Sequence, residues 1–396
     1  DNEEGLHDIV MESAYNNLHG WAFPIGSCFA IVAVVLSLYL VFQHLRSYTV
    51  SEEQKWIVGV IFMVPVYATD SVISLWDPRY SLVFDTLRDC YEAFALYSFS
   101  SYLVACLGGE RRVNEILEHK SRKSLETPML EEKAKENNSH IEPRSFRNFF
   151  VQPSIIGRDL FTIEKFGLVQ YMILKTLCAL VAIILEIFGV YGNGEFKFYY
   201  GYPYITLVLN FSQIWALYCL VQFYNVIHYK LRHIKPLAKF ISFKAIVFAT
   251  WWQGVGIALA SYLGILPKEQ KLETILQEFL ICIEMSVAAV AHIFVFSAEP
   301  YRPAHRAETI TTKVQGEEAT LQNTETRVET EGTSIRESVE DIVVQGGQCV
   351  MKDVILTINQ AIGPVEKGVT RIQETLLRKP NEETVNVKVE KRLEHT

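Results

Sequence analysis

The sequence predicts an all-α integral membrane protein: a bundle of seven transmembrane helices, with the N-terminus outside or lumenal and a C-terminal tail in the cytosol. Apolar residues make up 49% of the 396 residues. They gather in seven long blocks, each close to the roughly 20 residues that a helix needs to cross the hydrocarbon of a bilayer. Lys and Arg are spread very unevenly over the segments between the blocks, which indicates a fixed orientation.

The seven blocks contain few charges. Trp21–Phe42, Tyr202–Ile227 and Ala245–Leu266 contain none, and the other four contain one to three each. A soluble protein with buried helices would not need seven such blocks. We predict spans at about residues 21–42, 56–75, 89–107, 166–189, 202–227, 241–266 and 273–298.

Counting Lys and Arg gives the orientation. The segments 43–55, 108–165, 228–240 and 298–313 contain twenty, whereas the segments on the opposite side contain five. Because basic residues favour the cytosolic side, residues 1–21 are expected outside or in a lumen, with the loop 108–165 and the tail 298–396 in the cytosol. Residue 1 is Asp; a cleaved signal peptide or a shortened chain would explain this equally well.

The net charge of −8 lies mostly outside the predicted transmembrane domain, residues 22–297. Five acids and no base occur in residues 1–21, and the tail is acidic. This balance gives no support to a nucleic-acid partner. Six of the seven cysteines fall within predicted spans, without the spacing of a metal site, so we expect neither metal nor cofactor.

The tail contains a polar stretch, Glu308–Thr333, which we expect to be disordered, as we do the middle of the loop 108–165. After it, apolar residues recur every three or four positions and predict an amphipathic helix over about 334–377, with a kink at Pro364. Such a helix suits a partner helix or the membrane surface. It could equally fold back on the cytosolic face of the chain.

Several charges fall inside the predicted spans, where each is costly and needs a reason. Asp89 and Glu92 share one helix face. With Asp70 and Glu186 they place four carboxyls in the outer half of the bundle, a set that could bind cations or relay protons. For Asp89 and Asp70, a solvated interfacial position is an equal alternative.

Lys175 and Glu284 both fall within a few Å of the predicted midplane, so we expect them to pair with each other. The functional interpretation is a polar core that binds an amphiphile, formed by Asp89, Glu92, Lys175, Glu186, Gln253 and Glu284. The alternative is a buried structural ion pair, together with interhelical hydrogen bonds from residues such as Gln253.

The fifth-to-sixth connection, HYKLRHIKPLAKF, is basic. Its four cations could bind anionic lipid headgroups, but ordinary positive-inside topology is the simpler explanation. These cations are Lys230, Arg232, Lys235 and Lys239.

Several stretches together resemble one family. RDCYEAFALYSFSSYLVACLGGE at 88–110, FGLVQYMILKTLCALVAIILEIFGVY at 166–191, KPLAKFISFKAIVFATWWQ at 235–253 and AEPY at 298–301 are similar to the organic solute transporter alpha-subunit and transmembrane protein 184 family. YGNGEFKFYYGYPYI is closest to its plant Lazarus-one branch. The matching motif positions are Arg88, Asp89, Tyr91, Glu92, Gly108, Gly109, Glu110, Gln170, Lys175, Lys235, Pro236, Lys244 and Gln253. Gly108 and Gly109 are expected to end a helix.

The resemblance implies a seven-helix membrane protein that binds or moves an amphiphilic, steroid-like or lipid-like solute. In plants it also implies effects on vacuolar or plasma-membrane integrity, steroid-hormone signalling or cell death. The implied partners are membrane lipids and either a single-span subunit or a second copy. The chain lacks the cysteine-rich stretch of the transporter alpha subunit and has Lys175-Thr176 where many relatives have Lys-Pro.

Two functions compete at this point. The first is the carrier or amphiphile binder, in the vacuolar membrane (tonoplast), another endomembrane or the plasma membrane. The alternative is a receptor-like or scaffolding protein in endomembrane trafficking, acting through its loop and tail. An enzyme is not expected, because no GxGD motif accompanies Asp70 and His292 stands nearly alone among the spans.

Overall fold

The computed structural model describes residues 2–77, 79, 81–131, 158–192, 197–264, 270–302 and 334–363. Every regular element in these ranges is helical, and none of them contains a strand. The main helices are α1 (Asn2–Arg46), α2 (Ser51–Ile61), α3 (Met63–Trp76), α4 (Ser81–Cys106), α5 (Glu110–Glu131), α7 (Arg158–Ile187), α8 (Tyr202–Leu231), α9 (Pro236–Tyr262) and α10 (Gln270–Val295). Residues up to Gly346 form one compact unit, and those from Gly347 form another.

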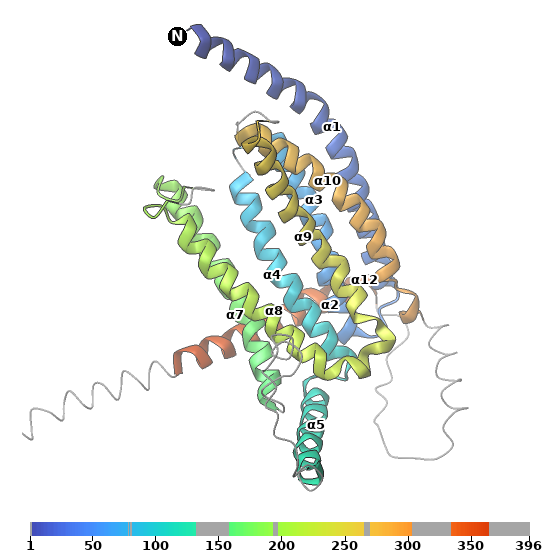
Figure 1. Ribbon diagram of the computed structural model, residues 1–396. Coiled ribbons are helices and arrows are strands. Elements are labelled where there is room, and N and C mark those ends of the chain that lie inside the picture. Colours follow the sequence, from blue (N-terminus) through green and yellow to red (C-terminus); the bar gives the residue numbers. More distant parts are fainter. Residues whose placement is uncertain are drawn as a thin grey trace, which may run out of the picture. The chain divides into compact units, whose positions relative to one another are not determined.

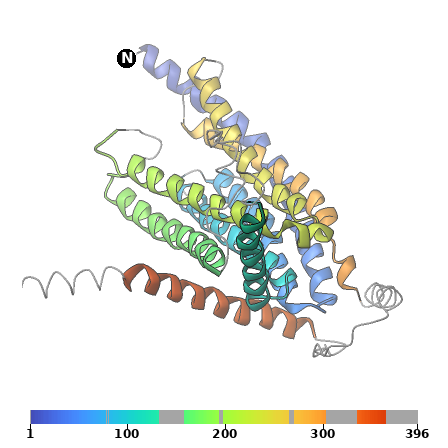
Figure 2. The same ribbon diagram turned by 60° about the horizontal axis from the view of Figure 1, so that its bottom comes forward.

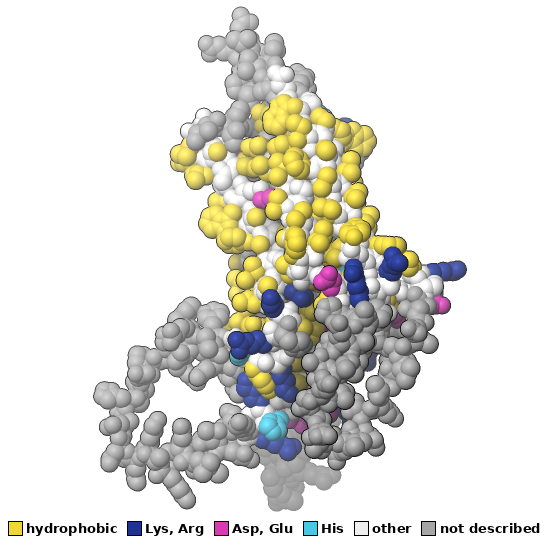
Figure 3. Space-filling model, turned by 90° about the vertical axis from the view of Figure 1, so that its right-hand side faces the viewer, with side chains coloured by type: hydrophobic (Ala, Val, Ile, Leu, Met, Phe, Trp, Pro, Cys, Tyr) yellow, Lys and Arg dark blue, Asp and Glu magenta, His cyan; other side chains and the backbone are white. Residues whose placement is uncertain are grey.

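Six helical segments within the described ranges are long and apolar enough to cross a membrane: Asn17–Arg46, Ser51–Trp76, Leu160–Ile187, Tyr202–Leu231, Pro236–Tyr262 and Leu272–Tyr301. A seventh is present if Ser81–Cys106 and Glu110–Lys120, which meet at 74°, count as one span. One face of the molecule shows a broad apolar band, with Lys and Arg gathered toward its lower end (Figure 3). The chain is thus an all-α membrane protein with six to seven candidate spans.

The segment Ser51–Trp76 consists of two helices, because α2 ends at Ile61 and α3 begins at Met63. Pro65 explains the interruption: it has no N–H to donate to the carbonyl of Ile61, and its ring crowds that carbonyl. The region predicted as one span, 56–75, therefore contains a break at Phe62, in its first half.

The helix α4 ends at two glycines. Gly108 and Gly109 have φ values of +93° and +86°, which side chains rarely tolerate. The N–H of Gly109 donates to the carbonyl of Val104, and that of Gly108 to the carbonyl of Ala105. This left-handed ending redirects the chain into α5, so the prediction that the two glycines end a helix is confirmed.

The helices pack in two groups around α4. On one side α1, α3 and α10 contact one another, and α9 packs on α10; on the other side α7 and α8 lie side by side (Figures 1 and 2). The helix α4 contacts α2, α3 and α7 and touches α8 and α9. Its position gives the polar residues of its first half access to nearly every other helix.

The first part of the tail belongs to the main unit. Ser334 and Glu337 form a capping box that starts α12 (Ile335–Glu340), and a π-helical turn, Asp341–Gln345, follows. The Tyr48 hydroxyl, between α1 and α2, donates to Asp341 at 2.7 Å. Burial, followed by this hydrogen bond, raises the pKa of the Tyr48 phenol above its usual range, so the hydroxyl keeps its proton.

Residues 346–363 are α-helical as well. The remainder of the predicted amphipathic segment, 364–377 with Pro364, lies outside the described residues. So do the stretch Glu308–Thr333 and most of the loop stretch expected to be disordered.

Candidate functional site

The first half of α4 carries Asp85, Arg88, Asp89 and Glu92 within eight residues. Residues spaced i, i+3, i+4 and i+7 lie on one face of an α-helix, so these four side chains leave α4 on the same side, spread over an arc of about 100°. Each of the last three forms an ion pair with a different helix. The helix α4 is therefore cross-linked by charge to α10, α7 and α9.

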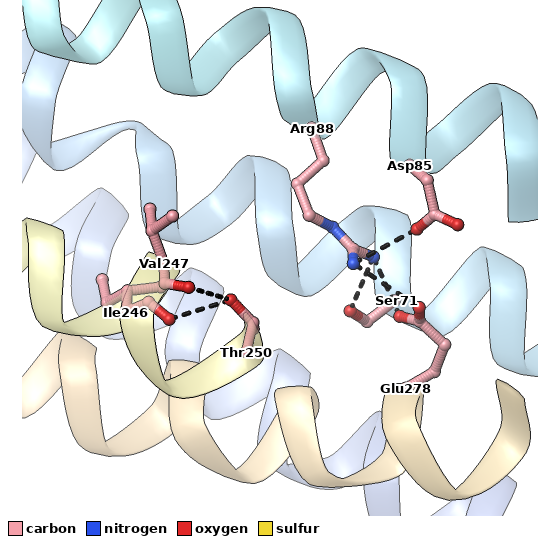
Figure 4. Close-up of polar contacts among 7 residues, drawn as sticks. All are labelled: Ser71, Asp85, Arg88, Ile246, Val247, Thr250 and Glu278. Carbon is pink, nitrogen blue, oxygen red and sulfur yellow. Dashed lines mark hydrogen bonds and ion pairs between the residues drawn. The ribbon is translucent and has the colours of Figure 1, made fainter. Parts of the chain in front are cut away.

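Arg88 makes the link to α10. Its guanidinium lies 2.9 Å from the Glu278 carboxylate and donates to the Ser71 hydroxyl of α3 at 3.2 Å (Figure 4). Asp85, one turn earlier on α4, lies 3.3 Å away, and the guanidinium stands over the Tyr67 ring at 5.5 Å. Both Arg88 and Glu278 are almost completely buried. Pairing and hydrogen bonding are what make such burial tolerable.

Asp89 makes the link to α7. The Lys175 ammonium lies 3.0 Å from its carboxylate and stands over the Tyr171 ring at 5.9 Å. Lys175 is buried, whereas the side chain of Asp89 is 53% exposed. The pair therefore has one member that can be reached from solvent.

Glu92 makes the link to α9 and also to α8. Its carboxylate accepts from the Lys244 ammonium at 2.5 Å and from the Gln213 amide at 3.3 Å. Glu92 is buried and Lys244 nearly so. Through Glu92, the two groups of helices are tied together at one carboxylate.

These three ion pairs border a cavity of about 940 Å³. Its walls come from α3, α4, α7, α8, α9 and α10, and its volume lies in the range of pockets that hold small ligands. Six charged residues line it, three acids and three bases: Asp85, Arg88, Asp89, Glu92, Lys175 and Lys244. Tyr191, just past the end of α7, also lines it; burial, with Tyr202 next in effect, raises the pKa of this phenol to about 12.

The remaining walls are largely apolar. Leu209 and Leu217 come from α8, and Ile241, Phe248 and Trp251 come from α9. The last three are also more than half exposed, so they form the rim where the cavity opens to the outside of the bundle. Charges in its interior and apolar side chains at its rim give the cavity the character of a site for an amphiphile.

The structure brings together three of the predicted core residues and separates the others. Asp89, Glu92 and Lys175 line the cavity. Gln253 donates to Glu284 between α9 and α10, but neither of these lines the cavity. Glu186 lies exposed near the end of α7.

The predicted pairing of Lys175 with Glu284 is wrong. Lys175 pairs with Asp89, and Glu284 accepts from Gln253. The reason is helix order: α7 packs on α4 and α8, whereas α10 packs on α1, α3 and α9. Similar depth in a membrane does not bring two side chains together when another helix separates them.

The basic connection between α8 and α9 is only partly available for headgroups. Lys230, Arg232 and Lys235 are exposed. Lys239 instead donates to the Ile234 carbonyl at 3.1 Å and stands over the Phe296 ring at 5.8 Å. Lys235 has a left-handed backbone, with φ at 48°, and precedes Pro236 at the first position of α9, so this motif shapes a turn.

Other motif residues hold helices together. The Tyr91 hydroxyl donates to the Gly59 carbonyl of α2 at 2.8 Å. Gln170 of α7 donates to the Ser212 carbonyl of α8, and Lys165 lies 2.5 Å from Glu110. In the AEPY motif, Tyr301 donates to Glu53 at 2.9 Å.

Sequence reasoning missed Glu278 and gave Lys244 no place in the polar core. Glu278 lies in the same apolar block as Glu284, and any carboxylate inside such a block already indicates a buried partner. Lys244 was present only as a motif position. Its role depends on α9 facing Glu92, which no spacing within α9 reveals.

Comparison with known proteins identifies the family. Residues 22–301 match the model described as organic solute transporter Ostalpha. The chain belongs to the organic solute transporter Ostalpha family. The resemblance found in the motifs is thus confirmed, and the chain is a transporter-like integral membrane protein of this family.

Three proteins of Arabidopsis thaliana are similar over most of the chain. Protein LAZ1 homolog 2 is 64% identical over 379 residues, which cover 94% of this chain and 93% of that protein. Protein LAZ1 is 45% identical over 390 residues, covering 93% and 80%. Protein LAZ1 homolog 1 is 44% identical over 374 residues, covering 90% and 77%. No solved structure matches the chain.

Proposed function

We propose that the chain binds an amphiphilic, steroid-like or lipid-like solute in the cavity beside α4 and moves it across the membrane. The observation that carries the proposal is the cavity itself, with its paired charges inside and its apolar rim on α9. The rigid apolar part of such a solute would lie against Phe248 and Trp251. The polar end of the solute would reach Lys175 or Lys244, which pair with Asp89 and Glu92 at the cavity wall.

Paired charges suit this purpose. Lys175 and Lys244 are already held by Asp89 and Glu92, so the empty cavity contains no uncompensated charge among these four residues. An anionic solute group that takes Lys175 displaces the Asp89 carboxylate, which is exposed enough to be solvated, whereas displacing the buried Glu92 from Lys244 would leave a bare charge. Because Asp89 is half-exposed, its pair with Lys175 is the easier one to open.

In the orientation that we propose, the N-terminus lies outside or in a lumen, and the α8–α9 connection and the tail lie in the cytosol. The count of twenty Lys and Arg against five supports it. The membrane that we propose is the vacuolar membrane, another endomembrane or the plasma membrane of a plant cell. Effects on membrane integrity, steroid-hormone signalling or cell death would follow from solute handling there, with a single-span subunit or a second copy as partner.

The proposal is tested by binding of a tritiated steroid sulfate to the full chain in lipid nanodiscs. Glu92→Gln and Lys175→Met are each expected to lower binding at least tenfold, because Lys175→Met removes a cation that the sulfate meets and Glu92→Gln removes the carboxylate that holds Lys244 and Gln213 at the cavity wall. Lys165→Met is the matched control: it removes a lysine from the same helix, α7, that pairs with Glu110 outside the cavity.

Expression and thermal unfolding of all three variants are measured alongside. Binding that is unchanged in both cavity variants, with folding intact, contradicts the proposal. Equal loss in the control and the cavity variants contradicts it too, because the cavity would then have no special part.

A receptor-like or scaffolding role is the second candidate, and the docked start of the tail favours it. Residues 334–345 are part of the main unit and pack on α1 and α2, with a hydrogen bond from Tyr48 to Asp341, so this part of the tail has a defined place. The scaffold predicts that deletion of residues 334–377 abolishes function in a complementation assay while steroid-sulfate binding stays normal. A deletion without phenotype counts against it.

A further inference from the structure

Asp70 is a buried carboxyl of α3 that does not line the cavity. The residue is only 4% exposed, and its Oδ2 atom has no hydrogen-bond partner. It belongs to no ion pair in the described part of the chain. The strongest charges acting on it are those of Arg88 and Glu278.

The charges around Asp70 do not balance. Glu278 takes the Arg88 guanidinium at 2.9 Å and is as deeply buried as Asp70. Two buried carboxyls thus share one buried cation. Asp85 also lies near Arg88, but its side chain is 46% exposed and faces the cavity, where water can solvate it. If Asp70 and Glu278 were both ionised, the buried part of the cluster would carry one excess negative charge.

Among the described residues, the helices packed against α3 bring no second cation to Asp70. From α4, Asp85 and Arg88 face this region, and from α10, Glu278. From α1, the His19 ring contacts the Leu75 carbonyl at 3.0 Å, beyond Asp70 along α3. From α2, Lys55 is already paired with Glu52. Within the described residues no three His, Cys, Asp or Glu side chains converge as metal ligands would.

We propose that Asp70 is a proton-binding site, a carboxyl that holds its proton at neutral pH while Glu278 stays ionised against Arg88. One proton removes the excess charge completely, and a buried carboxyl that lacks a cation is neutralised in this way. Asp70 takes the proton because Glu278 already accepts from Arg88. Ser74, one turn further along the same face of α3, is fully buried with an unpartnered hydroxyl oxygen and can accept the Asp70 O–H.

The site differs from the cavity in what it binds, and the proposal does not depend on any solute. Arg88 connects the two, because its guanidinium borders the cavity and also neutralises Glu278. A proton held on α3, the helix that also contributes Tyr67 to the cavity wall, gives the chain a built-in response to pH.

Infrared spectroscopy of the full chain in nanodiscs tests the proposal directly. The carbonyl stretch of a protonated carboxylic acid is separate from the bands of a carboxylate, and aspartate labelled with ¹³C at its side-chain carboxyl shifts only the Asp contribution. At neutral pH the wild type is expected to show a protonated Asp band that Asp70→Asn removes. Asp85→Asn, at the exposed carboxyl of the cluster, is expected to keep it. A wild type without the band, or a band that survives Asp70→Asn, overturns the proposal.

Charge counting supplies a second variant. Glu278→Gln leaves Asp70 as the only buried carboxyl beside Arg88, so Asp70 is expected to ionise and the band to disappear although Asp70 is still present. Persistence of the band in this variant contradicts the proposal.

Stability against pH gives a third reading. The folded chain holds a proton that the unfolded chain releases, so raising the pH through neutrality is expected to lower the Tm of the wild type more steeply than that of Asp70→Asn. Equal slopes would also contradict the proposal.

Discussion

At the scale of single residues, the interior of this membrane protein tolerates charge because each buried cation near the cavity has an acid beside it. Arg88, Lys175 and Lys244 each lie within 3.0 Å of a carboxylate from another helix. Breaking such a pair is costly because the remaining partner is left buried and uncompensated. Asp70 differs from these buried residues because it forms no ion pair among the described residues, and by the same reasoning we propose that it is neutralised by a proton.

Arg88→Met is expected to lower the free energy of unfolding by about 3–5 kcal/mol, because it leaves Glu278 buried without its cation. The double variant Arg88→Met/Glu278→Met should regain most of that loss, since no bare charge remains. Thermal unfolding in detergent measures both.

Arg112→Met serves as the control for this experiment. Arg112 pairs with Glu115 on the exposed surface of α5, where a pair contributes no more than about 1 kcal/mol. A double variant as unstable as the single one would mean that packing of the Arg88 side chain, rather than charge, decides stability.

At the scale of elements, two glycines allow helices to approach closely. A Cβ added at Gly167 of α7 would lie 2.8 Å from the Cys219 sulfur of α8, and one at Gly59 of α2 would lie 2.9 Å from the Ser98 hydroxyl of α4. The first contact holds α7 and α8 together as a pair. That pair carries Lys175 and Gln213 to the cavity.

Gly167→Ala is expected to destabilise the chain by about 1–3 kcal/mol, the usual cost of overpacking. Cys219→Ala in the same chain should restore part of the loss by removing the sulfur that the new methyl group meets. Gly256→Ala is the matched control, because a Cβ there meets nothing within 4 Å. Thermal unfolding compares the three, and equal destabilisation at Gly167 and Gly256 would contradict the packing argument.

The elements also show what a sequence can and cannot predict. Long apolar blocks predicted a helical membrane protein, and the motif glycines predicted the end of α4, because both depend on local composition and backbone geometry. Pro65 is a local signal for the interruption at Phe62, but a prediction based only on the length of the apolar block does not use it. The partner of Lys175 had no local signal, since it depends on α4 lying between α7 and α10.

The site follows the same division. Asp89, Glu92 and Lys175 could be singled out because charge within a span is costly wherever the span packs. Glu186 has that same property in the sequence, yet it lies exposed near a helix end. Only the packing of α4 against α7, α8 and α9 separates residues that line the cavity from those that do not.

At the scale of the whole molecule, the proposed orientation places the basic connections on one side of the membrane. An N-glycosylation acceptor inserted in the α7–α8 connection near residue 198 is expected to be modified in microsomes. The same acceptor inserted after Glu118 in α5 should remain unmodified, because the cytosol lacks the glycosylation machinery. Western-blot mobility before and after glycosidase treatment reads the result, and the reverse pattern would overturn the orientation.

The three ion pairs of α4 also limit which substitutions the chain can accept in evolution. A charge lost on α7, α9 or α10 leaves its counterpart within one stretch of five residues, Arg88 to Glu92. Second-site suppressors of Lys175, Lys244 or Glu278 substitutions should therefore converge on that stretch, although the three original positions lie on three different helices. Residues 88–92 are therefore expected to covary among relatives with positions 175, 244 and 278.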